Sequence, residues 1–120
     1  GKSLVPLFRN AAASLDRPAL FWHFPCFLQG KGDPHGGPFR TTPAGAIRMG
    51  DWKLIEWFES GRIELYNLRD DIGEQHNLAK ANLQKTTQLL RALRQWRKDV
   101  DAPIPSIPNP KYKPTTATLR

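Results

Sequence analysis

One segment, 46–79, constrains the fold of this chain most strongly. Its sequence is AIRMGDWKLIEWFESGRIELYNLRDDIGEQHNLA. Aromatic and branched residues gather in three short runs, at 46–49, 52–58 and 63–66, and such residues favour strands. Turn-forming residues separate the runs, at Gly50-Asp51 and at 59–62. The segment therefore predicts three short strands, the last two joined as a hairpin.

The middle run, 52–58, has apolar residues on both faces of the strand that it predicts. Trp52, Leu54 and Phe58 share one face, whereas Ile55 and Trp57 share the other. Strands with two apolar faces are typical of a sheet that is covered on both sides. We therefore expect a central strand with both of its faces covered.

A long helix is predicted after the polar turn at 67–73, from about Leu83 to Val100, with Asn82 as its N-cap. Its apolar residues recur at spacings typical of a helix that lies on a sheet: Leu89, Leu90, Leu93, Trp96 and Val100. Four basic residues fall largely on the other side and are interpreted as a solvated face: Arg91, Arg94, Arg97 and Lys98.

The remaining segments complete an α+β fold, a small sheet packed against this helix. Residues 1–13 predict a short helix with Ser3 as a cap. The apolar run 18–27 predicts a further strand, and Pro25 within it favours an edge position or a strand that ends near Phe24. Residues 28–43 are rich in glycine and proline and predict a loop.

Composition limits the classes of protein to consider. A chain of 120 residues forms one domain at most, and no apolar run approaches the ~20 residues of a membrane helix. The net charge is +7, and from Lys80 onward nine basic residues face two acidic ones. This surplus leaves open a basic module that binds polyanions or nucleic acid, although we favour an ordinary solvated surface over specific nucleic-acid binding.

The chain also resembles a known family. The segments PALFWHFP, 46–79 and PNPKYKP are similar to the C-terminal subdomain of bacterial arylsulfatase-type sulfatases, which hydrolyse sulfate esters. The ordered series GDWKLI, ELYNL, an acidic turn, GE and NLA carries this resemblance. It implies an antiparallel sheet of about four strands on a long C-terminal helix. It also implies a catalytic domain as partner and a periplasmic or extracellular location for the full-length enzyme.

The resemblance divides the chain into three parts. Residues 1–16 are expected to be the end of the upstream catalytic domain and a connector. Residues 17–100 are expected to form the subdomain, and residues 101–120 an extended or disordered proline-rich tail.

Catalysis in this family, by the same resemblance, uses a calcium ion and a formylglycine made from a Cys/Ser-x-Pro-x-Arg motif. The only cysteine here, Cys26, is followed by Phe-Leu-Gln-Gly, and no Asp/Asn cluster resembles the metal site. We therefore expect neither catalytic residues nor metal ligands in this chain, and no sulfatase activity from the chain alone.

Four residues are candidates for the wall of a substrate pocket: Trp22, His23, His35 and Arg40. Trp22 could instead lie in the core or at an interface, and His23 could be a partly buried histidine bonded to backbone. His35 and Arg40 lie in the glycine-rich stretch, which could be a simple flexible loop. Cys26 is interpreted as a packing residue, and a nucleophilic pair with His23 or His35 is the alternative.

Overall fold

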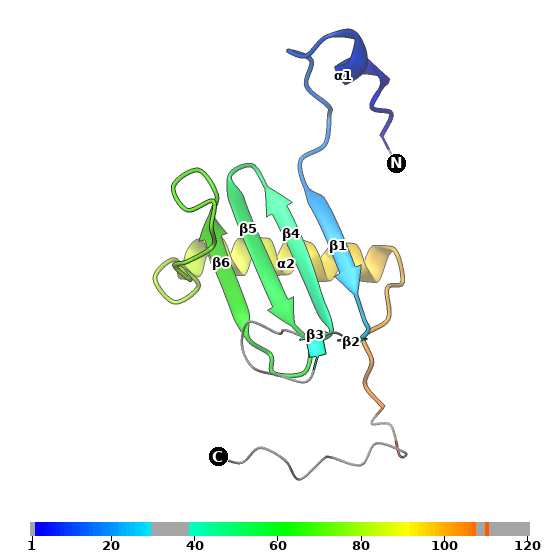
Figure 1. The fold of residues 1–120 in the computed structure, drawn as a ribbon, viewed down its shortest axis with the longest axis vertical. Helices are drawn as coiled ribbons and strands as arrows, with labels where there is room; N and C mark the ends of the chain where they lie inside the picture. The colour runs from blue at the N-terminus through cyan, green and yellow to red at the C-terminus, as the bar shows by residue number, and fades with distance from the viewer. Residues whose placement is uncertain (1, 30–38, 108–109, 111–120) are drawn as a thin grey trace.

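The computed structural model describes residues 2–29, 39–107 and 110 of the chain (Figure 1). Within them lie two helices and six strands: α1 (Val5–Arg9), β1 (Leu20–Phe24), β2 (Leu28–Gln29), β3 (Phe39–Thr41), β4 (Ala44–Met49), β5 (Trp52–Trp57), β6 (Ile63–Asn67) and α2 (Leu83–Asp99). Among the residues so described, no helix is both long and apolar enough to cross a membrane.

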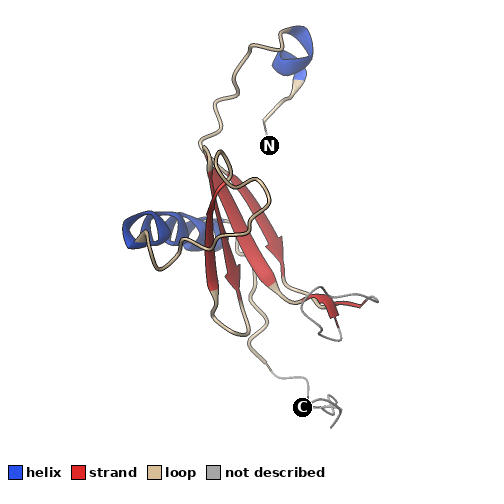
Figure 2. Ribbon diagram, turned by 60° about the vertical axis from the view of Figure 1, so that its left-hand side comes forward, coloured by secondary structure: helices blue, strands red, loops and turns tan. Residues whose placement is uncertain are grey.

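The main sheet has four antiparallel strands in the order β1-β4-β5-β6, and α2 crosses one of its faces (Figures 1 and 2). This arrangement confirms the predicted α+β fold with about four strands and a long C-terminal helix. Strand β1 is an edge strand that ends at Phe24, just before Pro25, as the sequence predicted. A separate two-stranded sheet, β2–β3, lies within the segment that the sequence predicted to be a loop.

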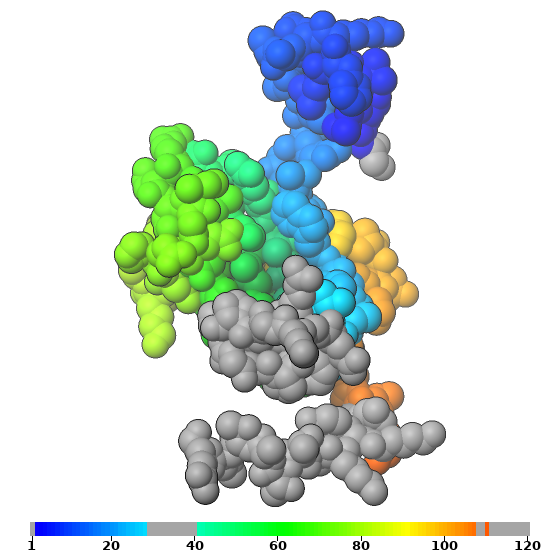
Figure 3. Space-filling model, in the orientation of Figure 1, coloured from blue at the N-terminus to red at the C-terminus, as the bar shows by residue number. Residues whose placement is uncertain are grey.

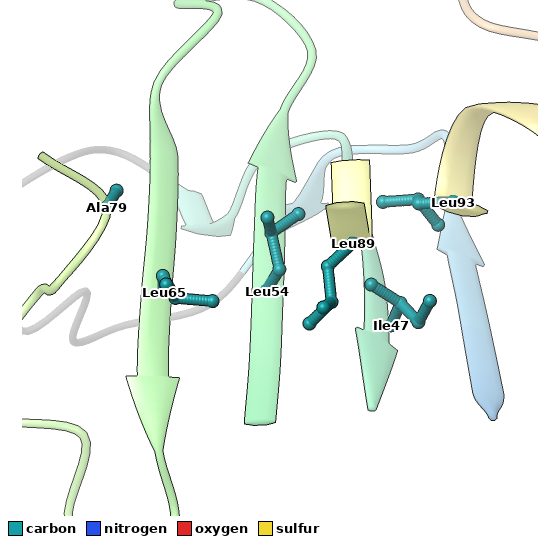
Figure 4. Packing of buried hydrophobic residues seen from close by; sticks show 6 residues of the cluster. All are labelled: Ile47, Leu54, Leu65, Ala79, Leu89 and Leu93. Atoms are coloured by element: carbon teal, nitrogen blue, oxygen red, sulfur yellow. The ribbon is translucent and has the colours of Figure 1, made fainter. Parts of the chain in front are cut away.

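The core forms where one row of side chains across the sheet meets α2. Strand register aligns Ile47 with Leu54 and Leu54 with Leu65, so that these three side chains point to the same face. All three are fully buried, as are Leu89 and Leu93 of α2 (Figure 4). Together with Ala79 they form a single apolar cluster between the two layers.

Helix α2 begins as predicted, with the Asn82 side chain accepting a hydrogen bond from the Lys85 N–H at 3.1 Å. Two details of its predicted faces were wrong. Arg97 is buried with Leu89 and Leu93, because residues four apart lie on one side of a helix. Val100 lies just beyond the helix end and is 53% exposed.

The turn between β6 and α2 is organised by two polar side chains. The Asp71 carboxylate accepts from the N–H groups of Gln75 and His76, at 3.0 and 2.8 Å. The Asn77 side chain accepts from the Leu65 N–H at 3.1 Å and donates to the Ile63 carbonyl oxygen at 3.2 Å. These bonds hold the turn along the free edge of β6, so the acidic turn and the NLA part of the family-like segment have a structural role.

Two further expectations differ from the structure. Strand β5 is central, but α2 covers only one face of the sheet, and Ile55 and Trp57 are half-buried on the other face. Helix α1 is shorter than predicted and contains no buried residue. It lies beyond the end of the sheet (Figures 1 and 3).

The two-layer core predicts a clear difference between two leucines of α2. Leu93→Ala removes fully buried methyl groups and is expected to lower the free energy of unfolding by about 2–5 kcal/mol. Leu83, which is 68% exposed, supplies the control. Leu83→Ala should change the free energy of unfolding by less than about 0.5 kcal/mol. Urea unfolding followed by circular dichroism measures both, and equal losses would contradict this core.

Candidate functional site

The face of the sheet opposite α2 carries exposed apolar side chains. Leu20, Trp22 and Phe24 alternate along β1 onto this face and are 36%, 50% and 41% exposed. Ile55 and Trp57 of β5 continue the face with partly buried side chains, and Arg62 lies 5.0 Å above the Trp57 ring. Figure 1 is seen from this side of the sheet. We call the side chains of Leu20, Trp22, Phe24, Ile55 and Trp57 the uncovered apolar face.

His23 points to the other side of the sheet, toward the layer of α2. Its Nε2–H donates to the carbonyl oxygen of Pro103 at 2.7 Å, which joins β1 to the segment after α2. Its ring lies 5.4 Å from that of Phe58, and its buried Nδ1 has no partner among the described residues. This half-buried position, bonded to backbone, matches one of the two interpretations that the sequence left open.

Trp22 and His23 therefore lie on opposite faces of the sheet, because neighbouring residues in a strand alternate. The two side chains can both reach one pocket only at the edge or end of β1. His35 lies outside the described residues. For Arg40 the structure gives only the backbone, in β3.

Among the described residues, no catalytic group forms around Cys26. Cys26 is exposed. The Nε2–H of His23 donates to the Pro103 carbonyl oxygen, and its Nδ1 has no partner among the described residues, so no hydrogen bond joins His23 to Cys26. Within residues 2–29, 39–107 and 110, no three His, Cys, Asp or Glu residues gather as metal ligands would.

A buried ion cluster lies between the sheet and α2. Glu56 of β5 accepts hydrogen bonds from the Nε and Nη2 of Arg94, at 3.0 and 2.6 Å, and from the Nη1 of Arg97 at 2.7 Å. The side chains of Glu56 and Arg97 are 9% and 8% exposed, and that of Arg94 is 57% exposed. The Arg97 guanidinium also lies 5.1 Å from the Phe58 ring.

Burial alone would raise the pKa of Glu56, but hydrogen bonds and positive charge from Arg94 and Arg97 outweigh it and hold the pKa below its usual value. Burial, together with Glu64, raises the pKa of Tyr66 to about 12, so its hydroxyl stays protonated at neutral pH. The N–H groups of Gln75 and His76 lower the pKa of Asp71. None of these shifts moves a group toward neutral pH, where an acid–base catalyst would need it.

The sequence analysis missed the Glu56 cluster, although a signal was present. Glu56 shares the inward parity of Trp52, Leu54 and Phe58, and a charged residue at an inward position needs a buried partner. Arg97 lies four residues after Leu93 and supplies that partner.

Comparisons with known proteins agree with the fold. No family model matches the chain. A protein named Sulfatase from Formosa agariphila is 32% identical over 114 residues, which cover 86% of this chain and 19% of that protein. The solved structure of BT4656 in complex with its substrate D-glucosamine-2-N,6-O-disulfate has a TM-score of 0.63 at 22% identity, over 84% of this chain and 20% of that one.

The chain thus spans about a fifth of the length of each of these proteins. These findings confirm the resemblance seen in the sequence: the chain is similar to a small part of a sulfatase and fits a C-terminal subdomain of one.

The buried cluster predicts a pH-dependent stability. Because the pKa of Glu56 is lowered in the folded state, its stabilising contribution is present above the usual pKa of glutamate and is lost as the pH falls through the lowered value. Glu56→Gln should cost about 3 kcal/mol at neutral pH, since Arg97 is left buried without its counter-charge.

Urea unfolding at neutral pH and at about pH 3 tests this prediction, because the gap between wild type and Glu56→Gln should narrow in acid. Exposed Glu59, which forms no ion pair among the described residues, provides the control variant Glu59→Gln. A gap that stays constant with pH would contradict the assigned role of Glu56.

Proposed function

We propose that this chain completes a sulfatase, a sulfuric ester hydrolase, by packing on its catalytic domain. The uncovered apolar face is the observation that carries the proposal. A half-exposed tryptophan between two exposed apolar residues on one strand is typical of a surface that another structure covers. The matched sulfatase is about five times longer than this chain, which leaves room for a partner domain.

Helix α1 supports the same interpretation. It has no buried residue, and its apolar side chains are open to solvent, with Phe8 83%, Val5 47% and Leu7 38% exposed. A helix of five residues is not stable without packing. In the full-length enzyme we expect α1 to pack on the catalytic domain, close to the connector that leads into β1.

The reaction itself is assigned to the catalytic domain. Formylglycine requires a Cys/Ser-x-Pro-x-Arg motif that the residues after Cys26 do not provide, and the described residues contain no candidate metal cluster. The described residues therefore do not fit a calcium site, the sequence after Cys26 does not fit formylglycine formation, and we assign this chain no chemical step. Its contribution to activity would be through packing and the shape of the pocket.

A pocket wall is the second part of the proposal. Strand β1 ends, and β4 begins, at the end of the sheet near which β2 and β3 lie (Figure 1). Pockets occur preferentially where domains meet. We assign four residues to the wall of a pocket near this end of the sheet: Trp22, His23, His35 and Arg40. A sulfated sugar is the favoured substrate class, since BT4656 was solved with one, and the enzyme is expected to act in the periplasm or outside the cell.

Packing on a catalytic domain predicts an effect that appears only in the full-length enzyme. Trp22→Lys places a charge on the uncovered apolar face and should lower the thermal unfolding midpoint of the full-length enzyme by several degrees, while leaving the 120-residue chain nearly unchanged. Leu83→Lys, at an exposed leucine of α2, is the control and should be neutral in both. An unchanged midpoint for Trp22→Lys in the full-length enzyme would contradict the proposal.

Two substitutions at His23 separate a substrate contact from a structural one. Gln can still donate to the Pro103 carbonyl oxygen, whereas Ala cannot. If the imidazole contacts substrate, both His23→Gln and His23→Ala should raise the KM of the full-length enzyme about tenfold or more. If KM and kcat stay unchanged in His23→Gln and only His23→Ala loses stability, His23 serves only to hold the segment around Pro103.

A further inference from the structure

A second surface lies on α2. A groove of about 450 Å³ runs along one side of the helix and is lined by residues from successive turns, with partly buried Leu90 in its wall. Arg91, Arg94 and Lys98 also line it. Residues three and four apart on a helix are neighbours, so these cations form one row about 10 Å long. We call this the α2 basic groove.

The positive charge of the groove is only partly neutralised. Neither Arg91 nor Lys98 forms an ion pair with any described residue. Arg94 uses its Nε and Nη2 on Glu56, which leaves its Nη1 without a described partner.

Three carboxylates lie near these cations in the fold or along the chain, those of Glu56, Asp99 and Asp101, and the N–H of Asp101 donates to the Lys98 carbonyl oxygen at 3.3 Å. Glu56 is shared between Arg94 and buried Arg97, and Asp99 accepts a hydrogen bond from Gln95 at 2.7 Å. Four cations in this part of α2 therefore lie near three anions, and no ion pair joins Asp99 or Asp101 to a cation among the described residues.

We propose that the α2 basic groove binds a sulfated polysaccharide, as a secondary site that holds the polymer while its sulfate esters are processed elsewhere. Arginine offers paired N–H donors to the oxygens of a sulfate group, and lysine offers a compact charge. The row of cations is long enough to contact more than one sulfate along a polymer. The choice of a sulfated polymer over other polyanions rests on the proposed function.

The lining of the groove favours a polysaccharide over nucleic acid. Proteins that bind single-stranded nucleic acid combine basic grooves with aromatic side chains on which bases stack. The groove has no aromatic residue, and its remaining polar lining is made of Thr86, Thr87 and Gln95. Hydroxyl and amide groups suit hydrogen bonds to sugar hydroxyls.

The site is separate from the proposed packing surface. Helix α2 lies on one side of the sheet, and the uncovered apolar face lies on the other (Figure 2). A catalytic domain packed on that face would leave the α2 basic groove accessible. Both proposals can therefore be tested independently.

The test measures binding of the 120-residue chain to immobilised heparin, a densely sulfated polysaccharide. The double variant Arg91→Gln/Lys98→Gln should bind about tenfold more weakly at fixed salt, with a shallower dependence of log Kd on log salt concentration. Arg9→Gln/Lys80→Gln removes the same charge from exposed sites outside the groove and should keep near wild-type affinity.

Four outcomes would overturn the inference. Equal weakening by both double variants would mean that net charge alone drives binding. Equal binding to desulfated heparin would exclude recognition of sulfate. Tighter binding to single-stranded DNA at the same salt would make nucleic acid the better ligand. A full-length enzyme that hydrolyses sulfate esters, while the groove variant binds heparin normally, would reject this inference and leave the proposed function intact.

Discussion

The contact of Glu56 with Arg94 and Arg97 determines how α2 lies on the sheet. Among the described residues, it is the one place where a buried carboxylate of the sheet pairs with arginines of α2, and both of its oxygens accept hydrogen bonds, at 2.6–3.0 Å. Gly45 lies opposite Glu56 in the register, and a Cβ there would lie 3.1 Å from Phe58 Cζ and 3.4 Å from Arg97 Nη1. Glycine thus leaves room for the guanidinium and the ring. A misplaced helix would leave these charges buried without partners, which is costly.

This contact also decides how the two faces of the sheet differ. Because α2 satisfies the inward side chains of β4, β5 and β6, only the outward side chains of the sheet are left for another partner. The segment that carries the family resemblance, 46–79, supplies strands, turns and the Asn77 fastening of β6, not reacting groups. The outward face and the end of β1 are therefore where a link to a catalytic domain is to be sought.

Much of the fold followed from local patterns. Runs of aromatic and branched residues between turn residues predicted β4, β5 and β6, Asn82 predicted the start of α2, and Pro25 predicted the end of β1. Local patterns could not show that α2 would cover only one face of the sheet, because the position of α2 depends on the path of the chain between β6 and the helix. They also placed Arg97 on the solvated side of α2, since an arginine can either face solvent or pair with a buried carboxylate. The candidate site was predicted less well, because Trp22 and His23 are neighbours in sequence but point in opposite directions.

The sequence by itself determined the class of fold and the likeness to a sulfatase subdomain, because periodicity, caps and turn residues act over short distances along the chain. Only the tertiary structure decided which charges are buried, which apolar face stays exposed and which backbone group His23 bonds. Those outcomes depend on contacts between residues 38 to 80 positions apart, Glu56 with Arg94 and His23 with Pro103. Such contacts are fixed by the packing of layers and leave no mark in the local pattern.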